Sequence, residues 1–157
     1  MSASTFSAQV WIVPSWALSL RVELAPWQKV NHVWGIGAVS KKVELLRTLE
    51  AHFGARGCPF VPTSYAWRQL LALPDWQAVV RAQPRWMVKT SRHRGEGVNL
   101  LTAEQVLALN TTSSPELLSG AVVQRYIGAP WLVGGHKFTL RLYSLITSAE
   151  PLRVYLP

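Results

Sequence analysis

The chain has few acidic residues and a single aspartate. Its 157 residues include 16 Lys and Arg against 8 Asp and Glu, which gives a formal net charge of +8 at pH 7. The lone aspartate, Asp75, directly follows Pro74, where it is placed to begin a helix. Magnesium bound together with a nucleotide usually needs one or two carboxylates, so these residues offer little for a metal clamp. The positive excess instead favours an acidic partner.

Cysteine is also scarce, because Cys58 stands alone. A single cysteine excludes an internal disulfide and a cysteine-built zinc site, and it favours a reducing compartment. The four histidines show no H-E-x-x-H spacing. These absences argue against metal chemistry through His or Cys, and we expect no metal ligands of that kind.

Long apolar runs and the common nucleotide and nucleic-acid motifs are missing. The run from Val10 to Leu20 is too short to span a bilayer, contains Pro14 and follows no Lys or Arg. No G-x-x-x-x-G-K-[ST] segment occurs, and the basic residues form neither a block nor a known DNA-binding module. We therefore expect a cytoplasmic protein without membrane or nucleic-acid partners.

The most informative stretch present is residues 137–143, where polar and apolar residues alternate with the period of a β-strand. One face would carry two cations and two hydroxyl groups, and the other would be apolar. The pattern predicts a strand whose polar face suits an anion. The polar face consists of Lys137, Thr139, Arg141 and Tyr143.

Two further strand-like runs complete a candidate nucleotide site. Residues 85–89 end in Lys89 and lead into a loop that contains Gly95 and Gly97, and such a loop suits phosphate oxygens. Residues 121–127 carry Gln124 beside apolar residues, an arrangement that suits the edge of a purine. Together these runs predict a site for a polyphosphate nucleotide.

The remaining patterns predict helices around these strands. One helix is expected over residues 41–52, capped by Ser40 and ended by Gly54, and a second from Asp75 to about residue 83. A capping box of Thr102 and Gln105 predicts a third helix up to residue 109. Residues 59–65 are expected to be an extended connector, and residues 110–120 a polar loop. The predicted fold class is α+β, with an antiparallel sheet and flanking helices.

Several short motifs, in order, resemble the tubulin tyrosine ligase-like family of ATP-grasp ligases. That family has the pattern W-[IMV]-V-K, a glycine loop, V-V-Q-[RK]-Y, K-F-D-[IL]-R and P-L-R-[IV]-Y. The counterparts here lie at residues 86–89, 95–97, 122–126, 137–141 and 151–155, and two upstream elements at residues 28–32 and 60–65 are also similar. The resemblance implies an ATP-grasp-like fold over roughly residues 27–157.

The resemblance also implies roles for individual residues. Lys42 and Lys89 would contact ATP phosphates, the backbone of Gly95 and Gly97 would approach them, and Lys137 would touch the nucleotide. Arg141 would be catalytic and would steady the transferred phosphate or the substrate carboxylate. The adenine edge would be formed by Gln124, Arg125 and Tyr126, and the ribose would be met by Thr139. The alternative for each is structural: solvated lysines, a plain core strand, or a salt-bridged strand.

Two departures and the length of the family's catalytic unit qualify this reading. Thr139 replaces the family aspartate near the ribose hydroxyls, and Thr90 replaces the proline that commonly follows Lys89. Because the family unit is longer, the resemblance implies a C-terminally truncated fragment whose Mg²⁺ ligands lie beyond residue 157. Residues 1–84 would be the N-terminal and linker region, and residues 85–157 the truncated nucleotide-binding region.

The implied function is ATP-dependent ligation of an amino acid, most simply glutamate, to the acidic tails of tubulin through an acyl phosphate. The implied partners are tubulin or microtubule tails and a free amino acid, with ATP and Mg²⁺ as cofactors, in the cytoplasm on the cytoskeleton or a cilium. The alternative function is a tubulin-binding module without turnover, which Thr139 in place of the family aspartate favours.

Overall fold

A computed structural model describes residues 10–11, 29–30, 35–54, 58–90 and 97–156. The chain divides into two compact units. One comprises residues 1–36 and 140–157, and the other residues 37–139. The sequence predicts a boundary between residues 84 and 85, and both of these residues fall in the second unit. The division of the ligase core at this boundary stays a prediction.

The second unit is built on a four-stranded antiparallel sheet in the order β3-β6-β4-β5. Its strands are β3 (Ser64–Ala66), β4 (Arg85–Lys89), β5 (Val98–Thr102) and β6 (Val122–Arg125). β6 lies between β3 and β4, so the last of these strands in the sequence is an inner strand of the sheet. The expected α+β class with an antiparallel sheet and flanking helices is confirmed.

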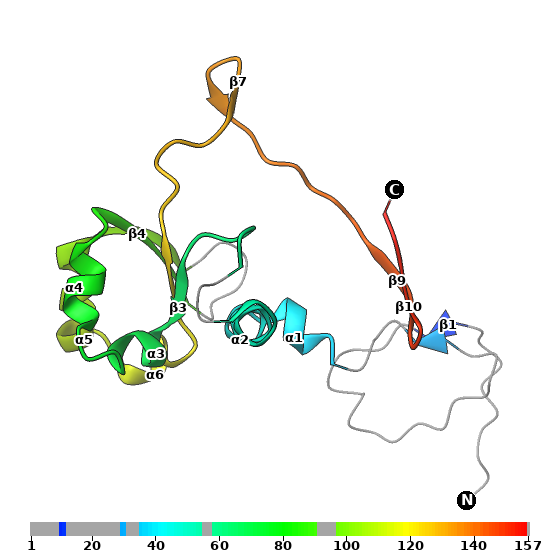
Figure 1. Cartoon of the computed structure of the whole chain (residues 1–157), viewed down its shortest axis with the longest axis horizontal. Helices are drawn as coiled ribbons and strands as arrows, with labels where there is room; N and C mark the ends of the chain where they lie inside the picture. Colours follow the sequence, from blue (N-terminus) through cyan, green and yellow to red (C-terminus); the bar gives the residue numbers. More distant parts are fainter. Residues whose placement is uncertain (1–9, 12–28, 31–34, 55–57, 91–96, 157) are drawn as a thin grey trace, which may run out of the picture. The chain divides into compact units, whose positions relative to one another are not determined.

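Four helices cover one face of this sheet, as Figure 1 shows. They are α3 (Trp67–Leu71), α4 (Trp76–Arg81), α5 (Ala103–Thr112) and α6 (Pro115–Ser119). Burial alternates along β4, where Trp86 and Val88 are buried and their neighbours are partly or fully exposed. The alternation turns every second side chain of the strand toward these helices.

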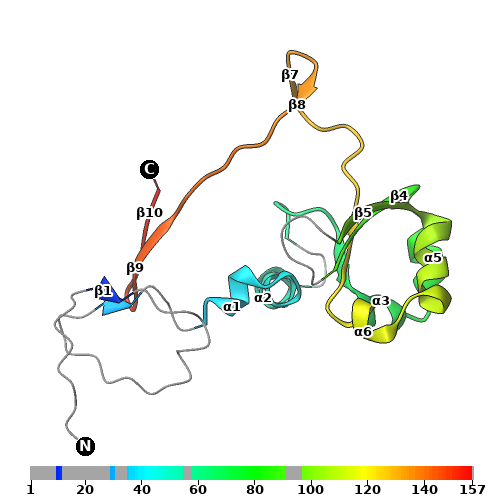
Figure 2. The ribbon, with the colours of Figure 1, turned by 180° about the vertical axis from the view of Figure 1, so that it is seen from behind.

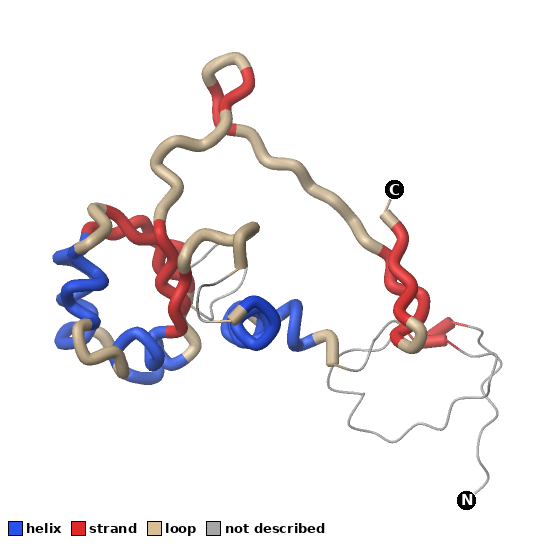
Figure 3. The backbone as a smooth tube through the Cα atoms, viewed as in Figure 1, coloured by secondary structure: helices blue, strands red, loops and turns tan. Residues whose placement is uncertain are grey.

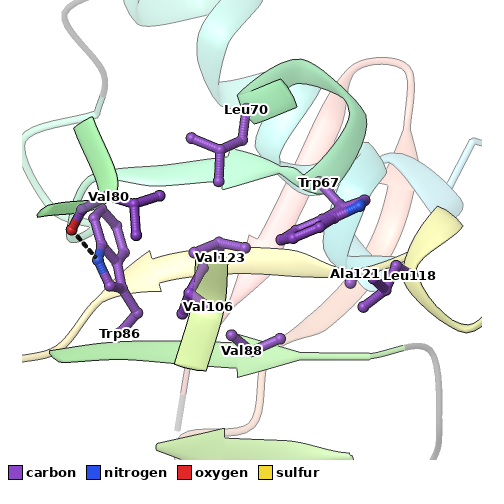
Figure 4. Close-up of a cluster of buried hydrophobic side chains, with 9 residues drawn as sticks. All are labelled: Trp67, Leu70, Val80, Trp86, Val88, Val106, Leu118, Ala121 and Val123. Atoms are coloured by element: carbon purple, nitrogen blue, oxygen red, sulfur yellow. Dashed lines mark hydrogen bonds between the residues drawn. The ribbon is translucent and has the colours of Figure 1, made fainter. Parts of the chain in front are cut away.

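The core between the sheet and these helices is apolar and contains nine buried residues (Figure 4). Trp86 is its largest fully buried side chain, with 1% of its surface exposed. Its indole N–H donates to the carbonyl oxygen of Val80 at 2.9 Å. This bond satisfies a buried donor that would otherwise be costly. The nine residues are Trp67, Leu70, Val80, Trp86, Val88, Val106, Leu118, Ala121 and Val123.

The opposite face of the sheet is covered in part by α2 (Lys42–Phe53) (Figure 2). Leu46 packs against Ala66 and Val122 in a second, smaller cluster. A short helix, α1 (Gly37–Ser40), precedes α2. The side chain of Lys89 lies on the α2 face, because it alternates with the core residues of β4.

The observed bounds of α2 and α4 lie within two residues of the predicted ones, but neither predicted N-cap side chain makes a capping bond. Gly54 ends α2 with φ of 76°, in the left-handed region that glycine adopts easily. Ser40 was expected to cap this helix, but it is the last residue of α1, and Lys41 is the N-cap without a side-chain bond. Asp75 precedes α4 as expected, although its side chain makes no capping bond.

The capping box that predicted α5 is present. The N–H of Gln105 donates to Thr102 Oγ1 at 3.3 Å, and the side chain of Gln105 accepts from the N–H of Thr102 at 2.9 Å. The expected polar loop over residues 110–120 is wrong in its second half, where Ser114 caps α6. Pro115 at the first helical position favours a helix start, and the prediction overlooked this signal.

The expected strand over residues 137–143 is wrong beyond its first residue. A short hairpin joins β7 (Leu132–Val133) to β8 (His136–Lys137) through Gly134 and Gly135, both with positive φ. Residues 138–144 belong to no strand, and Figure 3 shows them as a loop. Alternation marks a two-faced segment, but a strand also needs a paired backbone. No described strand runs beside these residues.

The first unit contains two small sheets among its described residues. β1 (Val10–Trp11) and β2 (Lys29–Val30) are parallel, whereas β9 (Leu145–Ala149) and β10 (Leu152–Tyr155) form an antiparallel pair. Within the described part of the whole chain, no helix has the length and apolar character that crossing a bilayer requires.

Candidate functional site

A chain of hydrogen bonds crosses three strands on the α2 face of the sheet. Lys89 Nζ donates to Gln124 Oε1 at 2.6 Å, and Gln124 Nε2 donates to Ser64 Oγ at 2.8 Å. Ser64 Oγ donates in turn to the carbonyl oxygen of Pro62 at 2.6 Å. Because an ammonium group can only donate, this chain fixes which way the Gln124 amide faces. Lys89 and Gln124, both predicted site residues, are therefore in direct contact.

Lys42 adds a second cation beside the end of β4. From the first position of α2, its ammonium donates to the carbonyl oxygen of Thr90 at 3.0 Å. Burial, and secondly the charge of Lys42, lower the pKa of Lys89 from its usual value. The ion pairs found among the described residues, Arg47–Glu44 and Arg81–Glu104, involve neither lysine.

Two lysines that repel each other and have no described carboxylate partner form a site that suits an anion. An anion placed between them would offset both the burial of the Lys89 charge and the repulsion from Lys42. The donor set fits a nucleotide phosphate, since ammonium groups bind phosphate as point charges. The predicted roles of Lys42 and Lys89 stay predictions, and the geometry is compatible with them.

A separate contact joins Tyr126 and Lys137. Lys137 Nζ donates to the phenol oxygen of Tyr126 at 2.7 Å and lies 5.2 Å from the centre of its ring. The hydrogen bond, followed by the charge of Lys137, lowers the pKa of the Tyr126 hydroxyl. This contact joins Lys137 of β8, which was predicted to touch the nucleotide, to Tyr126, the residue that follows β6.

The backbone beyond Gln124 is already engaged. The N–H of Arg125 donates to Thr63 at 2.8 Å, and that of Tyr126 donates to Arg85 at 3.4 Å. Both N–H groups are thus used by backbone carbonyl oxygens of neighbouring segments, so a purine edge would have to be met by other groups. The Arg125 side chain is exposed.

The glycine loop is described only at its end. Gly97 has φ of 89°, a left-handed conformation that favours glycine, and its carbonyl oxygen accepts the N–H of Thr90 at 2.8 Å. Gly95 lies outside the described residues. The contact with Thr90 anchors the C-terminal end of the loop beside Lys89.

Two predicted residues are not brought to the lysine pair by the sheet. Thr139 and Arg141 are exposed and lie in the segment that forms no strand. Arg141 belongs to the first compact unit, whereas Lys89 belongs to the second. Of the three segments expected to lie side by side, β4 and β6 are paired, but the third is not part of their sheet.

Sequence reasoning gave no role to Ser64 or Thr90, and both take part in this arrangement. Ser64 was noted only as part of a motif, although its register opposite Gln124 makes it the third link of the chain. Thr90 was noted only as a replacement for proline. Its carbonyl holds Lys42, and its hydroxyl oxygen is buried without a hydrogen-bond partner among the described residues, with 6% of the residue exposed.

We expect Thr90→Val to stabilise the protein by about 1 kcal/mol, because valine removes a buried hydroxyl that no described residue hydrogen-bonds while keeping the branched shape. The melting temperature should rise by roughly 4 °C, measured by circular dichroism without nucleotide. Thr102→Val, which removes a hydroxyl that caps α5, is the matched control and should lower the melting temperature. A lower melting temperature for Thr90→Val would show that its hydroxyl has a stabilising partner.

No group of three or more His, Cys, Asp or Glu side chains is placed to hold a metal ion within the described part of the chain. The Mg²⁺ ligands expected beyond residue 157 stay a prediction.

Comparison with known proteins identifies relatives over most of the chain. A model of the tubulin-tyrosine ligase family matches residues 20–156. The chain is 33% identical over 135 residues to the tubulin monoglutamylase TTLL4 of Mus musculus. This match covers 82% of this chain and 10% of the relative. The chain is 30% identical over 141 residues to the tubulin polyglutamylase TTLL7 of Homo sapiens, covering 85% of this chain and 15% of the relative.

A shorter match is closer in sequence. The probable alpha-tubulin polyglutamylase Ttll1 of Tetrahymena thermophila is 48% identical over 79 residues, or 45% of this chain and 19% of that protein. The chain thus spans less than a fifth of the length of these relatives. The family match over residues 20–156 accounts for the mixed helices and antiparallel sheet as part of an ATP-grasp-like fold. The chain belongs to the tubulin-tyrosine ligase family.

Proposed function

We propose that this chain carries part of the ATP site of a ligase that attaches an amino acid, glutamate, to tubulin tails. The observation that carries the proposal is the pair of lysines, Lys42 and Lys89, which meet at the end of β4 without a described carboxylate partner. In this proposal both ammonium groups bind phosphate oxygens of ATP. Gln124 holds the Lys89 side chain in place.

The reaction we propose transfers the terminal phosphoryl group of ATP to a carboxylate of the acceptor and releases ADP. The amine of the incoming amino acid then attacks the acyl phosphate, an amide bond forms and inorganic phosphate leaves. Such transfers depend on positioning and on neutralising the charge of the phosphoryl group. The two lysines would supply positive charge, Lys137 would contact the nucleotide, and Arg141 would steady the phosphate or the acceptor carboxylate.

In this scheme Mg²⁺ would help to neutralise the phosphate charge, and the described residues offer no group of carboxylates that would hold it. The donor set of the described residues is cationic around Lys89, so it fits the phosphates rather than the metal. Thr139 would meet the ribose through a hydroxyl group instead of the family's carboxylate.

The acceptor we propose is an acidic tubulin tail, which places the protein on the cytoskeleton. The chain's net charge of +8 favours association with an acidic partner. The relatives TTLL4, TTLL7 and Ttll1 are named for glutamylation of tubulin.

Incorporation of labelled glutamate into tubulin in the presence of ATP and Mg²⁺ tests this function. We expect incorporation by a longer protein that contains this chain, and its loss when Lys89 is replaced by alanine in that protein. Lys41→Ala is the control, because Lys41 is exposed beside Lys42 and makes no side-chain bond to a described residue.

The outcomes separate the ligase from the alternative of a binding module. Tubulin binding without incorporation by the longer protein would favour the module. Incorporation that survives Lys89→Ala would remove Lys89 from the ATP site.

A further inference from the structure

A cavity of about 250 Å³ lies on the helical side of the sheet, away from the Lys89 face. Residues of α3 and α6, the C-terminal half of α5 and the residues that connect α5 to α6 line it. Since the lysine pair occupies the α2 face, this cavity does not belong to the proposed ATP site. Its volume is below the range of about 300–1,000 Å³ typical of cofactor sites, so it suits one or two side chains of a peptide.

The floor of the cavity is apolar and is formed by residues of the core. Trp67 and Leu118, which line it, are both members of the buried core and are 5% and 3% exposed. Leu71 and Pro115 extend the apolar lining. Such a floor favours an aliphatic or aromatic side chain, because its burial removes apolar surface from water.

Arg68 is the one charged residue among those that line the cavity. Its side chain makes no ion pair or hydrogen bond with any residue in the described part of the chain. By contrast, Arg81 on α4 lies 3.7 Å from Glu104, and Arg47 on α2 lies 2.9 Å from Glu44. Among these helical arginines, Arg68 therefore keeps its guanidinium available for a carboxylate, which it can bind through two parallel N–H groups.

We propose that this cavity is a docking site for an acidic peptide segment. A carboxylate of the segment binds Arg68, and an adjacent apolar side chain enters the cavity over Trp67 and Leu118. The charge of the lining is positive, and its apolar part is too small for more than a short stretch of chain. This inference rests on the proposed function in one respect, that the acceptor is an acidic polypeptide. The cavity would hold that polypeptide away from the proposed ATP site.

Fluorescence anisotropy of a labelled peptide made of glutamates around one leucine tests the site, with the full chain and no nucleotide. Arg68→Gln should weaken binding about 10-fold, the effect of losing one charge-assisted contact. Ser119→Phe fills the cavity but keeps the charge, and it should also weaken binding. Arg81→Gln removes the same charge from α4, which contributes no residue to the lining, and should change binding by less than about 2-fold.

Several results would overturn the proposal. Equal weakening by Arg68→Gln and Arg81→Gln would indicate attraction by net charge alone, and an unchanged affinity for Ser119→Phe would exclude the cavity. Displacement of the peptide by free glutamate would indicate a site for a small molecule, and absence of peptide binding would also reject the proposal. Lys89→Ala should leave peptide binding intact, so failure of the ATP assignment is distinguishable from failure of this one.

Discussion

Replacing Trp86 by alanine is expected to remove a large part of the folding stability of the second unit. Trp86 is the largest fully buried side chain of the core, and its N–H is bonded to Val80. Losing a buried tryptophan costs about 3–5 kcal/mol. A domain of ordinary stability has about 5–15 kcal/mol in total, so this one change removes much of the margin. Urea unfolding followed by far-ultraviolet circular dichroism measures the loss.

Trp86→Phe and Trp131→Ala are the controls for this prediction. Phenylalanine keeps most of the apolar volume but removes the indole N–H, so the Val80 carbonyl oxygen keeps only the backbone N–H of Gln83 as donor, and an intermediate loss is expected. Trp131 is 84% exposed, and its replacement should cost less than about 1 kcal/mol. An urea midpoint of Trp86→Ala close to that of Trp131→Ala would contradict the described core.

Lys89→Ala is expected to abolish the rise in melting temperature that ATP produces. A ligand at 100 times its dissociation constant stabilises a protein by about 2.7 kcal/mol. In the proposed site Lys89 meets the phosphates together with Lys42, so most of this stabilisation should disappear. Thermal unfolding with and without ATP is the measurement, and Lys41→Ala, which changes the charge equally, should retain the shift. A shift of the same size in wild type and Lys89→Ala would contradict the assignment.

Without nucleotide, the charge of Lys89 should lower the stability of the protein, whereas in the presence of ATP it should raise it. The pKa of Lys89 is lowered by burial and by Lys42 from the usual 10.5. Between the lowered pKa and 10.5 the unfolded chain binds more protons than the folded one, so stability should rise with pH in that interval. Below it the charge is present in both states and its burial cost is fully felt. Lys89→Met should therefore stabilise the free protein at neutral pH and flatten the alkaline rise, as unfolding at several pH values would show.

Local patterns predicted the elements whose ends carry their own signals. β4 has the predicted bounds because its alternation is flanked by Pro84 and by the loop after Lys89. α5 begins where the capping box of Thr102 and Gln105 placed it. β5 was missed, because Val98–Thr102 has neither clean alternation nor a run of β-branched residues. Only its pairing with β4 makes it a strand.

The candidate site was predictable as a set of residue types but not as a set of contacts. Lys89 and Gln124 are 35 positions apart, and Gln124 and Ser64 are 60 apart. Their contact depends on the register of β4 and β3 with β6, which no local pattern encodes. The bond from Lys42 to the Thr90 carbonyl depends on where α2 packs on the sheet. The segment after Lys137 failed as a strand for the converse reason, since its pattern was right but no strand of the described residues pairs with it.

The inner position of β6 dictates an order of events during synthesis. β4 and β5 are near neighbours in the chain and can pair as soon as both have left the ribosome, at a small cost in loop closure. β3 emerges before either of them, yet it has no strand to join until residues 122–125 appear and insert between β3 and β4. A nascent chain halted before residue 122 would therefore hold β3 unpaired, and arrested ribosome complexes of increasing length should show protection of Tyr65 only after β6 has emerged.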